Sequence, residues 1–285
     1  MCRPAGIAEL HLAIGAERQE GGGRGTGETG HRRPDRYPAP LDFRVKLPIM
    51  ASSMNIDEAR PMSDTGAGGA YPPPERMRFE EDEGRFPWLS MLLDAYFVAD
   101  RGVAGAIAKE QKARELACSK GCASCCRVHL DIPVYPLELV GMTWYAAEKV
   151  EEPVRSTLRE QLAAHRQGEP CPFLVEDACS IHPMRPMACR QFNVFGTPCA
   201  EEEDAFHSRP DDVLQPDRSA IDEALTLTLP FYGILEGARE VVEAGLLNRV
   251  VQELQQCNWG SVAKKMEEFD AASGEEGASG PEQVP

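Results

Sequence analysis

The sequence lacks long apolar runs and has little positive charge. No stretch contains the roughly 20 consecutive apolar residues of a membrane-spanning helix. Glu9, His11 and Glu17 interrupt the apolar residues near the N-terminus, which excludes the apolar segment of a signal peptide. Lys and Arg number 30 against 46 Asp and Glu, so the formal net charge is −16. Such a surface repels phosphate backbones. We therefore expect a cytoplasmic protein that binds neither membranes nor nucleic acid.

Regular apolar spacing is missing from both ends of the chain. Residues 1–80 are rich in Gly and Pro, a composition that cannot offset the entropy lost on ordering. They are predicted to form a disordered low-complexity tail, and internal methionines such as Met50 and Met62 offer alternative starts. Residues 271–285 are predicted to be a second disordered tail. A single domain is expected between them, over residues 86–260, because 42% of the sequence is hydrophobic, which is enough for one core.

The ten cysteines are unevenly distributed, since eight of them lie between Cys118 and Cys199. The first four are crowded into Cys118-Ser-Lys-Gly-Cys122-Ala-Ser-Cys125-Cys126. In a reducing compartment, clustered thiols are more often ligands or catalysts than disulfides. Two residues between cysteines on a tight turn let both sulfurs face one metal, and Cys122 and Cys125 have this spacing. The segment therefore predicts a metal site.

A second group of cysteines follows at spacings that a folded chain could bring back to the first. The predicted metal ligands are Cys118, Cys122, Cys125, Cys126, Cys171, Cys179, Cys189 and Cys199. For the last four, the alternative of ordinary buried thiols stays open. Adjacent Cys125 and Cys126 cannot comfortably face one small ion, so Cys126 would bind a second centre or form a bridge.

Charge also favours a metal at this place. Four thiolates around Zn²⁺ or a [4Fe-4S]²⁺ core carry a net charge of about −2, and burying that charge requires nearby cations. Arg127, Arg185 and Arg190 each lie within a few residues of a cysteine in an otherwise acidic chain. They are predicted to compensate the charge of the thiolates.

The apolar spacing predicts a mainly helical fold. A helix is expected from Phe86 into Cys118, interrupted near Gly102 and ended by Gly121, so that the first thiol lies on its last turn. Further elements are expected as a short extended segment over 128–134, helices after Pro136 and Pro153, a hairpin over 171–182, a short helix after Pro186 and helices over 221–259. Together they predict a helical domain wrapped around a cysteine-rich site with a small β-hairpin.

The cysteine pattern has a counterpart among known families. The stretch Cys118–Cys126, followed by Cys171-Pro-Phe-Leu and by Cys179-Ser-Ile-His through Cys189-Arg, resembles the YkgJ-type cysteine-cluster family, the CxxCxxCC zinc- or iron-chelating domain. Leu137-Glu138 is similar to a helix-borne glutamate of that family. The chain departs from it in having three residues between Cys118 and Cys122 instead of two.

The resemblance implies a metal-chelating protein. The family includes flagellin lysine N-methylases, in which the same pattern is associated with an iron–sulfur cluster and with S-adenosylmethionine as methyl donor. His182 stands where the family commonly has a tyrosine, which leaves a mixed Cys/His site open, and His129 is a second candidate.

The leading hypothesis is a cytoplasmic metal-binding protein that holds an iron–sulfur (4Fe-4S) cluster or zinc through its cysteines. One alternative is a metal-dependent enzyme similar to protein lysine N-methyltransferases, although no glycine-rich donor loop follows a strand. The other is a metal-handling or redox-sensing protein whose thiols reach solvent. In each case the expected partner is a metal ion or cluster.

Overall fold

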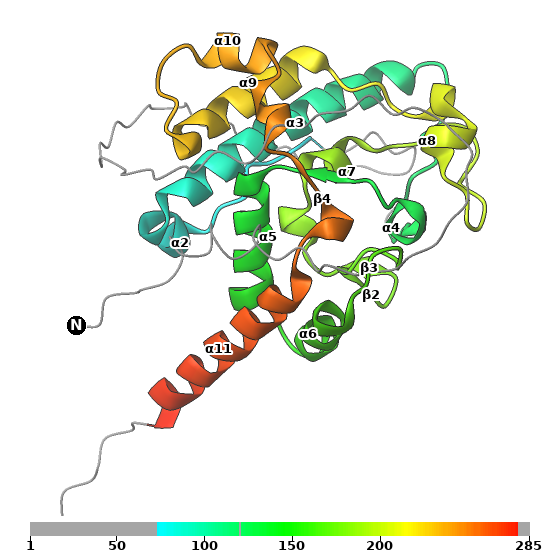
Figure 1. Ribbon diagram of the computed structural model, residues 1–285. Coiled ribbons are helices and arrows are strands. Elements are labelled where there is room, and N and C mark those ends of the chain that lie inside the picture. Colours follow the sequence, from blue (N-terminus) through cyan, green and yellow to red (C-terminus); the bar gives the residue numbers. More distant parts are fainter. Residues whose placement is uncertain (1–72, 120, 279–285) are drawn as a thin grey trace, which may run out of the picture.

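The computed structural model describes residues 73–119 and 121–278, so most of the predicted tail over 1–80 lies outside the described residues (Figure 1). The prediction of a mainly helical fold is confirmed. The α-helices are α2 (Glu80–Arg85), α3 (Pro87–Glu110), α4 (Ser124–Val128), α5 (Pro136–Glu148), α6 (Val154–Ala164), α7 (Met187–Gln191), α8 (Ala205–Ser208), α9 (Arg218–Thr228), α10 (Ala238–Glu243) and α11 (Trp259–Ala278). Within this part of the chain, no helix is both long and apolar enough to cross a lipid bilayer.

Short elements link these helices. The 3₁₀-helices are η1 (His182–Met184), η2 (Pro210–Asp212), η3 (Leu229–Tyr232), η4 (Leu246–Arg249) and η5 (Leu254–Gln256). The strands are β1 (Pro133–Val134), β2 (Leu174–Val175), β3 (Ala178–Cys179) and β4 (Gln252–Glu253). They form two antiparallel pairs, β1 with β4 and β2 with β3. The second pair is the predicted hairpin.

Helix α3 differs from the prediction at its C-terminal end. It runs without a break past Gly102 but stops at Glu110, so Cys118 does not lie on it. The next segment is extended against residues 194–196: Leu116 bridges Phe195, and Ala117 N donates to Val194 O at 2.8 Å. This long-range pairing overrides the local helical pattern, because it buries Phe195 fully.

Helix α5 lies at the centre of the fold between two apolar cores. Leu137 and Trp144 pack with α3 and α9, whereas Leu139 and Met142 pack with α6, α11 and the β2–β3 hairpin. Almost the whole surface of the helix is therefore buried, as expected for a central helix. Pro136 takes its first helical position, as the sequence predicted.

Helix α11 is part of the packed unit. Val262 and Met266 are buried in the same core as Leu158 of α6, so this core extends beyond residue 260. Arg155 fixes the arrangement: its buried guanidinium donates to Ala147 O at 2.8 Å and forms an ion pair with Asp270 at 2.6 Å.

The helix then continues to Ala278, into the stretch predicted as a disordered tail. Residues 279–285 lie outside the described part of the chain.

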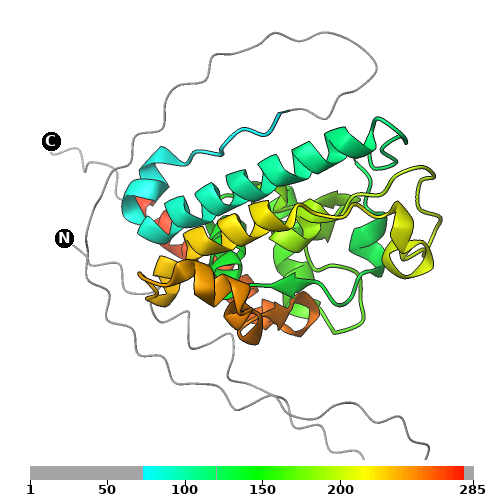
Figure 2. The same ribbon diagram turned by 90° about the horizontal axis from the view of Figure 1, so that it is seen from above.

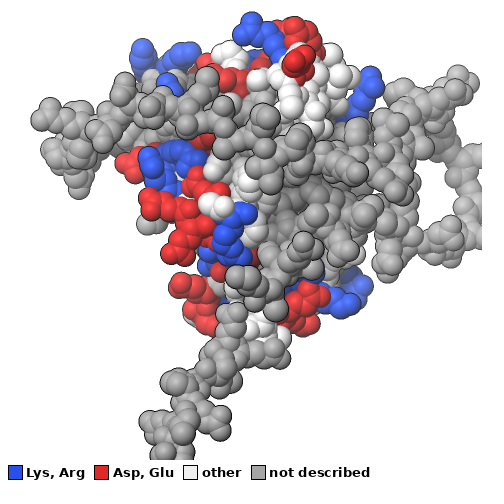
Figure 3. All heavy atoms as spheres, turned by 90° about the vertical axis from the view of Figure 1, so that its left-hand side faces the viewer, with Lys and Arg blue, Asp and Glu red and all other residues white. Residues whose placement is uncertain are grey.

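Charged side chains tie the first described residues to the helices. Arg76 Nη2 pairs with Glu83 at 2.7 Å and its Nε pairs with Asp94 at 2.6 Å. On the face shown in Figure 3, basic and acidic side chains are interspersed where described residues are visible. Acidic side chains on this face therefore have basic side chains near them.

Helices α3 and α9 lie side by side along one face (Figure 2). Their close approach depends on Gly102, because a Cβ atom there would meet Ala220 Cβ at 2.4 Å. Gly105, one turn further along α3, has nothing within 4 Å of the same position. Substitutions at the two glycines therefore distinguish the effect of packing on stability from the effect of helix propensity.

We expect Gly102→Ala to destabilise the protein by about 1–2 kcal/mol, because overpacking of ~1–3 kcal/mol exceeds the ~0.5–1 kcal/mol gained in helix propensity. The matched change Gly105→Ala should instead stabilise it by up to ~1 kcal/mol. Urea denaturation of the two variants measures both effects. Equal effects of the two changes would contradict the close contact at Gly102.

Candidate metal centre

All nine described cysteines are free thiols. Eight of them belong to the clustered part of the sequence. Cys118 and Cys122 precede α4, and Cys125 and Cys126 lie on it. Cys171 precedes β2, Cys179 lies in β3, Cys189 lies on α7 and Cys199 precedes α8. In Figure 1, α4, the hairpin and α8 are found at one end of the molecule. Cys257 follows η5, away from these segments in the sequence.

The extended segment after α3 places Cys118 beside the loop that carries Cys199. Gly196 N donates to Glu115 O at 2.8 Å, and Val194 N donates to the sulfur of Cys118 at 3.3 Å. Burial raises the pKa of Cys118, and the nearby Cys122, Cys125 and Cys199 raise it further. These thiols are therefore close enough to influence each other's charge.

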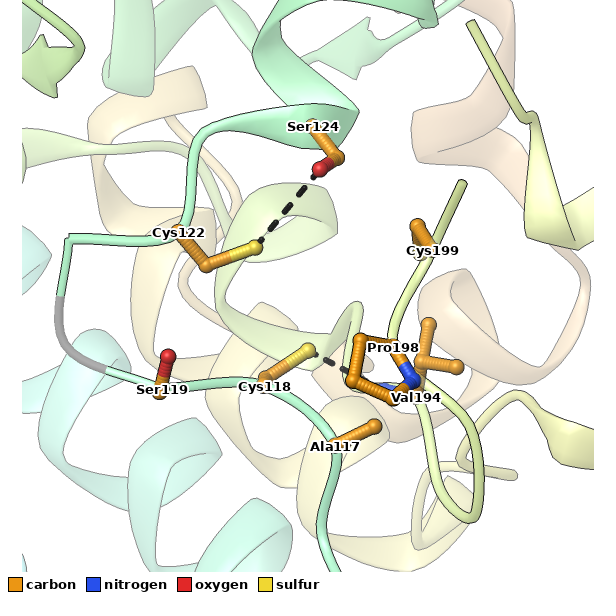
Figure 4. A pocket seen from close by; sticks show the side chains of 8 residues that line it. All are labelled: Ala117, Cys118, Ser119, Cys122, Ser124, Val194, Pro198 and Cys199. Atoms are coloured by element: carbon orange, nitrogen blue, oxygen red, sulfur yellow. Dashed lines mark hydrogen bonds between the residues drawn. The ribbon is translucent and has the colours of Figure 1, made fainter. Parts of the chain in front are cut away.

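A cavity of about 130 Å³ lies between the two segments. It is lined by three thiols and five other residues: Cys118, Cys122, Cys199, Ala117, Ser119, Ser124, Val194 and Pro198. Figure 4 shows Cys118 and Cys122 on one side of it and Cys199 on the opposite loop. We call Cys118, Cys122 and Cys199 the outer thiols.

The helix α4 and the β2–β3 hairpin form the second half of the site. Cys171 N donates to Cys126 O at 2.7 Å, which joins the hairpin to α4. Leu174 pairs with Cys179 across the two strands. Arg127 forms an ion pair with Asp177 at the tip of the hairpin. The backbone thus holds the thiols of α4 and the hairpin near one another.

The thiols influence one another in the same order. The neighbouring thiol of Cys126, together with burial, raises the pKa of Cys125 far above its ordinary value. Cys125 in turn lowers the pKa of Cys126, but the nearby thiol of Cys171 and burial raise it to about 12. The pKa of Cys189 is raised by burial and by the nearby Cys125, Cys126 and Cys179. We call Cys126, Cys171, Cys179 and Cys189 the inner thiols.

Cys125 lies between the two groups. It influences the pKa of Cys118 and Cys199 among the outer thiols, and that of Cys179 and Cys189 among the inner ones. The fold therefore brings together thiols from both halves of the sequence pattern. Whether each one binds a metal stays a prediction.

Glu138 joins the helix that carries Cys189 to the centre of the fold. One carboxylate oxygen accepts from Met187 N at 2.6 Å, at the start of α7, and the other accepts from Tyr135 N at 3.0 Å, at the start of α5. Glu138 is only 1% exposed, and burial raises its pKa. Its role is to position α7, and hence Cys189, relative to α5.

The three arginines predicted to compensate charge have different surroundings. Arg127 is half exposed and pairs with Asp177. Arg190 is buried, pairs with Asp100 at 2.7 Å and stacks 3.9 Å from the ring centre of Tyr96.

Arg185 differs from the other two arginines in its surroundings. Its buried Nε has no hydrogen-bond partner among the residues that the structure describes. Its charge opposes the rise in pKa that burial imposes on Cys179 and Cys189. Arg185 is therefore the arginine best placed to meet a negative group at the inner thiols.

The two histidines considered as ligands have other surroundings. His129 Nε2 lies 3.2 Å from Asp204 Oδ1, and its ring stands edge-on to Phe192. Burial, with the charges of Arg185 and Arg190, lowers the pKa of His182 to about 4. Within the described residues, no hydrogen bond joins either imidazole to a thiol.

Sequence reasoning missed Arg209, which donates to the sulfur of Cys199 at 3.8 Å. Arg209 is held in turn by Glu203 at 2.8 Å and Asp212 at 3.0 Å. No local signal marks it, because it follows Cys199 by 10 residues, beyond an acidic stretch, and belongs to no motif. Only the turn of the chain between Cys199 and η2 brings it back.

The donors suit zinc or iron, both of which bind thiolates in proteins. Within the described residues, no three His, Cys, Asp or Glu side chains are already arranged as the ligands of one ion. The free thiols and the unpartnered Nε of Arg185 fit a thiolate-bound metal, and binding would require the side chains to draw together.

Residues 117–212 match the family model CxxCxxCC, a putative zinc- or iron-chelating domain. The resemblance predicted from the cysteine pattern is thus confirmed, and all eight clustered cysteines lie within the matched segment. The match supports metal binding by this domain. No curated protein and no solved structure matches the chain.

We expect Glu138→Gln to lower the free energy of unfolding by about 1–3 kcal/mol, because an amide nitrogen would replace one of the two acceptor oxygens and leave a buried N–H unpaired. The control is Glu160→Gln, at an exposed position of α6, which should change stability by less than about 0.5 kcal/mol. Chemical denaturation compares the two. A negligible effect at position 138 would contradict the role of Glu138 in joining α5 to α7.

Proposed function

We propose that this protein is a cytoplasmic metal-binding protein that holds an iron–sulfur cluster of the 4Fe-4S type or zinc through its clustered cysteines. The observation that carries this proposal is the packing of Cys126, Cys171, Cys179 and Cys189, from distant segments of the chain, on one core, with Cys171 N donating to Cys126 O at 2.7 Å. The unpartnered Nε of Arg185 supplies a cation for such a group. Metal ions and iron–sulfur clusters are the groups that thiolates in such a cluster commonly bind.

The proposed ligands are drawn from the outer thiols, the inner thiols and Cys125. Thiolates bind soft and borderline metals, whereas an ion bound by oxygen, such as Mg²⁺, would need carboxylates in their place. When bound, the metal would supply positive charge that holds the thiolates together and, in an iron–sulfur cluster, the capacity to transfer an electron. The protein supplies the fold that collects the sulfurs.

Arg185 supports the proposal through electrostatics. A buried cationic nitrogen without a partner is costly, and a thiolate or a cluster sulfur would provide the missing acceptor. Conversely, the negative charge of a four-thiolate centre needs a cation when it is partly buried. The metal centre and Arg185 therefore stabilise each other.

The proposed cytoplasmic location also rests on the thiols. Nine free thiols in the described residues, several of them partly exposed, persist as thiols in a reducing environment such as the cytosol. Methyl transfer, which the resemblance implies for some relatives, and redox sensing both stay predictions.

The proposal predicts that anaerobically purified full-length protein contains bound metal. A brown protein absorbing near about 400 nm would indicate an iron–sulfur cluster, and a colourless protein with tightly held zinc would indicate a zinc centre. The double change Cys171→Ser and Cys179→Ser should remove at least half of the bound metal, measured by plasma mass spectrometry. Cys257→Ser is the control, because the sulfur of this buried cysteine hydrogen-bonds to Gln252 and Glu253, and it should retain all the metal. Folded wild-type protein without metal would contradict the proposal.

We expect Arg185→Gln to weaken metal binding by ~10–100-fold, as the loss of partners around the ligands typically does. The fold of the protein should be unaffected, since Arg185 Nε makes no hydrogen bond in the structure. Arg127→Gln is the matched control, because that side chain is half exposed and pairs with an exposed aspartate. Competition with a chromophoric chelator measures both affinities. Equal affinities for the two variants would argue against a role for Arg185.

A further inference from the structure

The eight clustered thiols do not form one compact group. Two of the three outer thiols pack against one apolar cluster, and the inner thiols pack against another. Cys118 and Cys199 lie against the cluster of Val194, Ala205 and Val213. The inner thiols instead belong to, or pack against, the core shared by α5, α6, α11 and the hairpin. The two groups are therefore positioned by different parts of the fold.

Each group also has its own arginine. Arg209 donates to the sulfur of Cys199, and its guanidinium is fixed by Glu203 and Asp212. Arg185 influences Cys125 and inner thiols such as Cys179. A centre of thiolates needs compensating positive charge. The basic side chains that act on the two groups are therefore different, although Glu203 and Asp212 already balance the charge of Arg209.

The two groups differ in their relation to the cavity. The outer thiols line it and include the exposed Cys122, whereas the inner thiols do not line it and include the buried Cys171. A cavity of about 130 Å³ holds an ion together with a small additional ligand, because one water molecule occupies ~30 Å³. Three thiols that drew together around an ion in this space would leave a fourth coordination position open, as in sites that exchange or activate a ligand.

We propose that the chain holds two metal centres: an inner one at Cys126, Cys171, Cys179 and Cys189, and an outer one at Cys118, Cys122 and Cys199 that loads and releases a single thiophilic ion such as Zn²⁺ or Co²⁺. This inference rests on the proposed function. Cys125 lies between the centres and can join either. The outer centre exchanges its own ion with solution, whereas the inner centre retains its metal.

The experiment uses full-length protein and the double variant Cys118→Ser with Cys199→Ser. Both are purified anaerobically, analysed for metal, and then stripped and refilled with Co²⁺, whose thiolate complexes are coloured. For wild type we expect two classes of Co²⁺, one released to a chelator at least tenfold faster than the other. In the double variant the fast class should be lost and the slow class retained. Cys257→Ser should behave as wild type.

The results separate the two proposals. If wild type binds no metal, both fail. If it binds metal in one class only, or if the double variant loses all its metal or none, the two-centre proposal fails and metal binding stands. Should the stripped protein unfold, the metal content of the purified double variant decides: loss of part of the metal supports two centres, and an unchanged content or complete loss overturns them. Circular dichroism shows that the variant is folded.

Discussion

The hydrogen bond from Cys171 N to Cys126 O joins the two halves of the cysteine pattern, which lie far apart in the sequence. It is a backbone tie between α4 and the loop that leads into the β2–β3 hairpin, and the thiols of both segments also pack on one apolar core. The bond lies among partly buried groups, where an unpaired amide is costly. The folding of this region therefore brings the thiols of the two segments together.

The rest of the fold serves to hold these short segments in place. The helix α4 has no buried residues, and each strand of the hairpin has two residues, so neither is stable alone. They depend on α5 and α11, whose apolar side chains form the core beneath them. Glu138 adds α7 to this frame through two backbone amides. A rigid helical frame with short thiol-bearing segments on it suits a centre whose ligands must adjust to a metal.

The arginines near the thiols also have different roles. The chain carries a large excess of acidic residues, yet Arg185, Arg190 and Arg209 are found beside or beneath the thiols. Arg190 is fully used in holding Asp100 and backbone carbonyls, so it supports the fold more than the thiolates. The sequence pattern could not distinguish it from Arg185, because both follow a cysteine or precede one by only a few residues. Their difference lies in the partners that the fold supplies.

The amino-acid sequence was enough to identify the helical class, the helices begun by Pro136 and Pro153, the hairpin and the cysteine pattern, because each follows from local spacing or from proline geometry. It could not determine where α3 ends, since the pairing of Leu116 with Phe195 is a long-range contact. Nor could it show that α11 closes the core, or that Arg209 meets Cys199. The tertiary structure alone divided the thiols into an outer and an inner group, because that division depends on which apolar cluster each segment packs against.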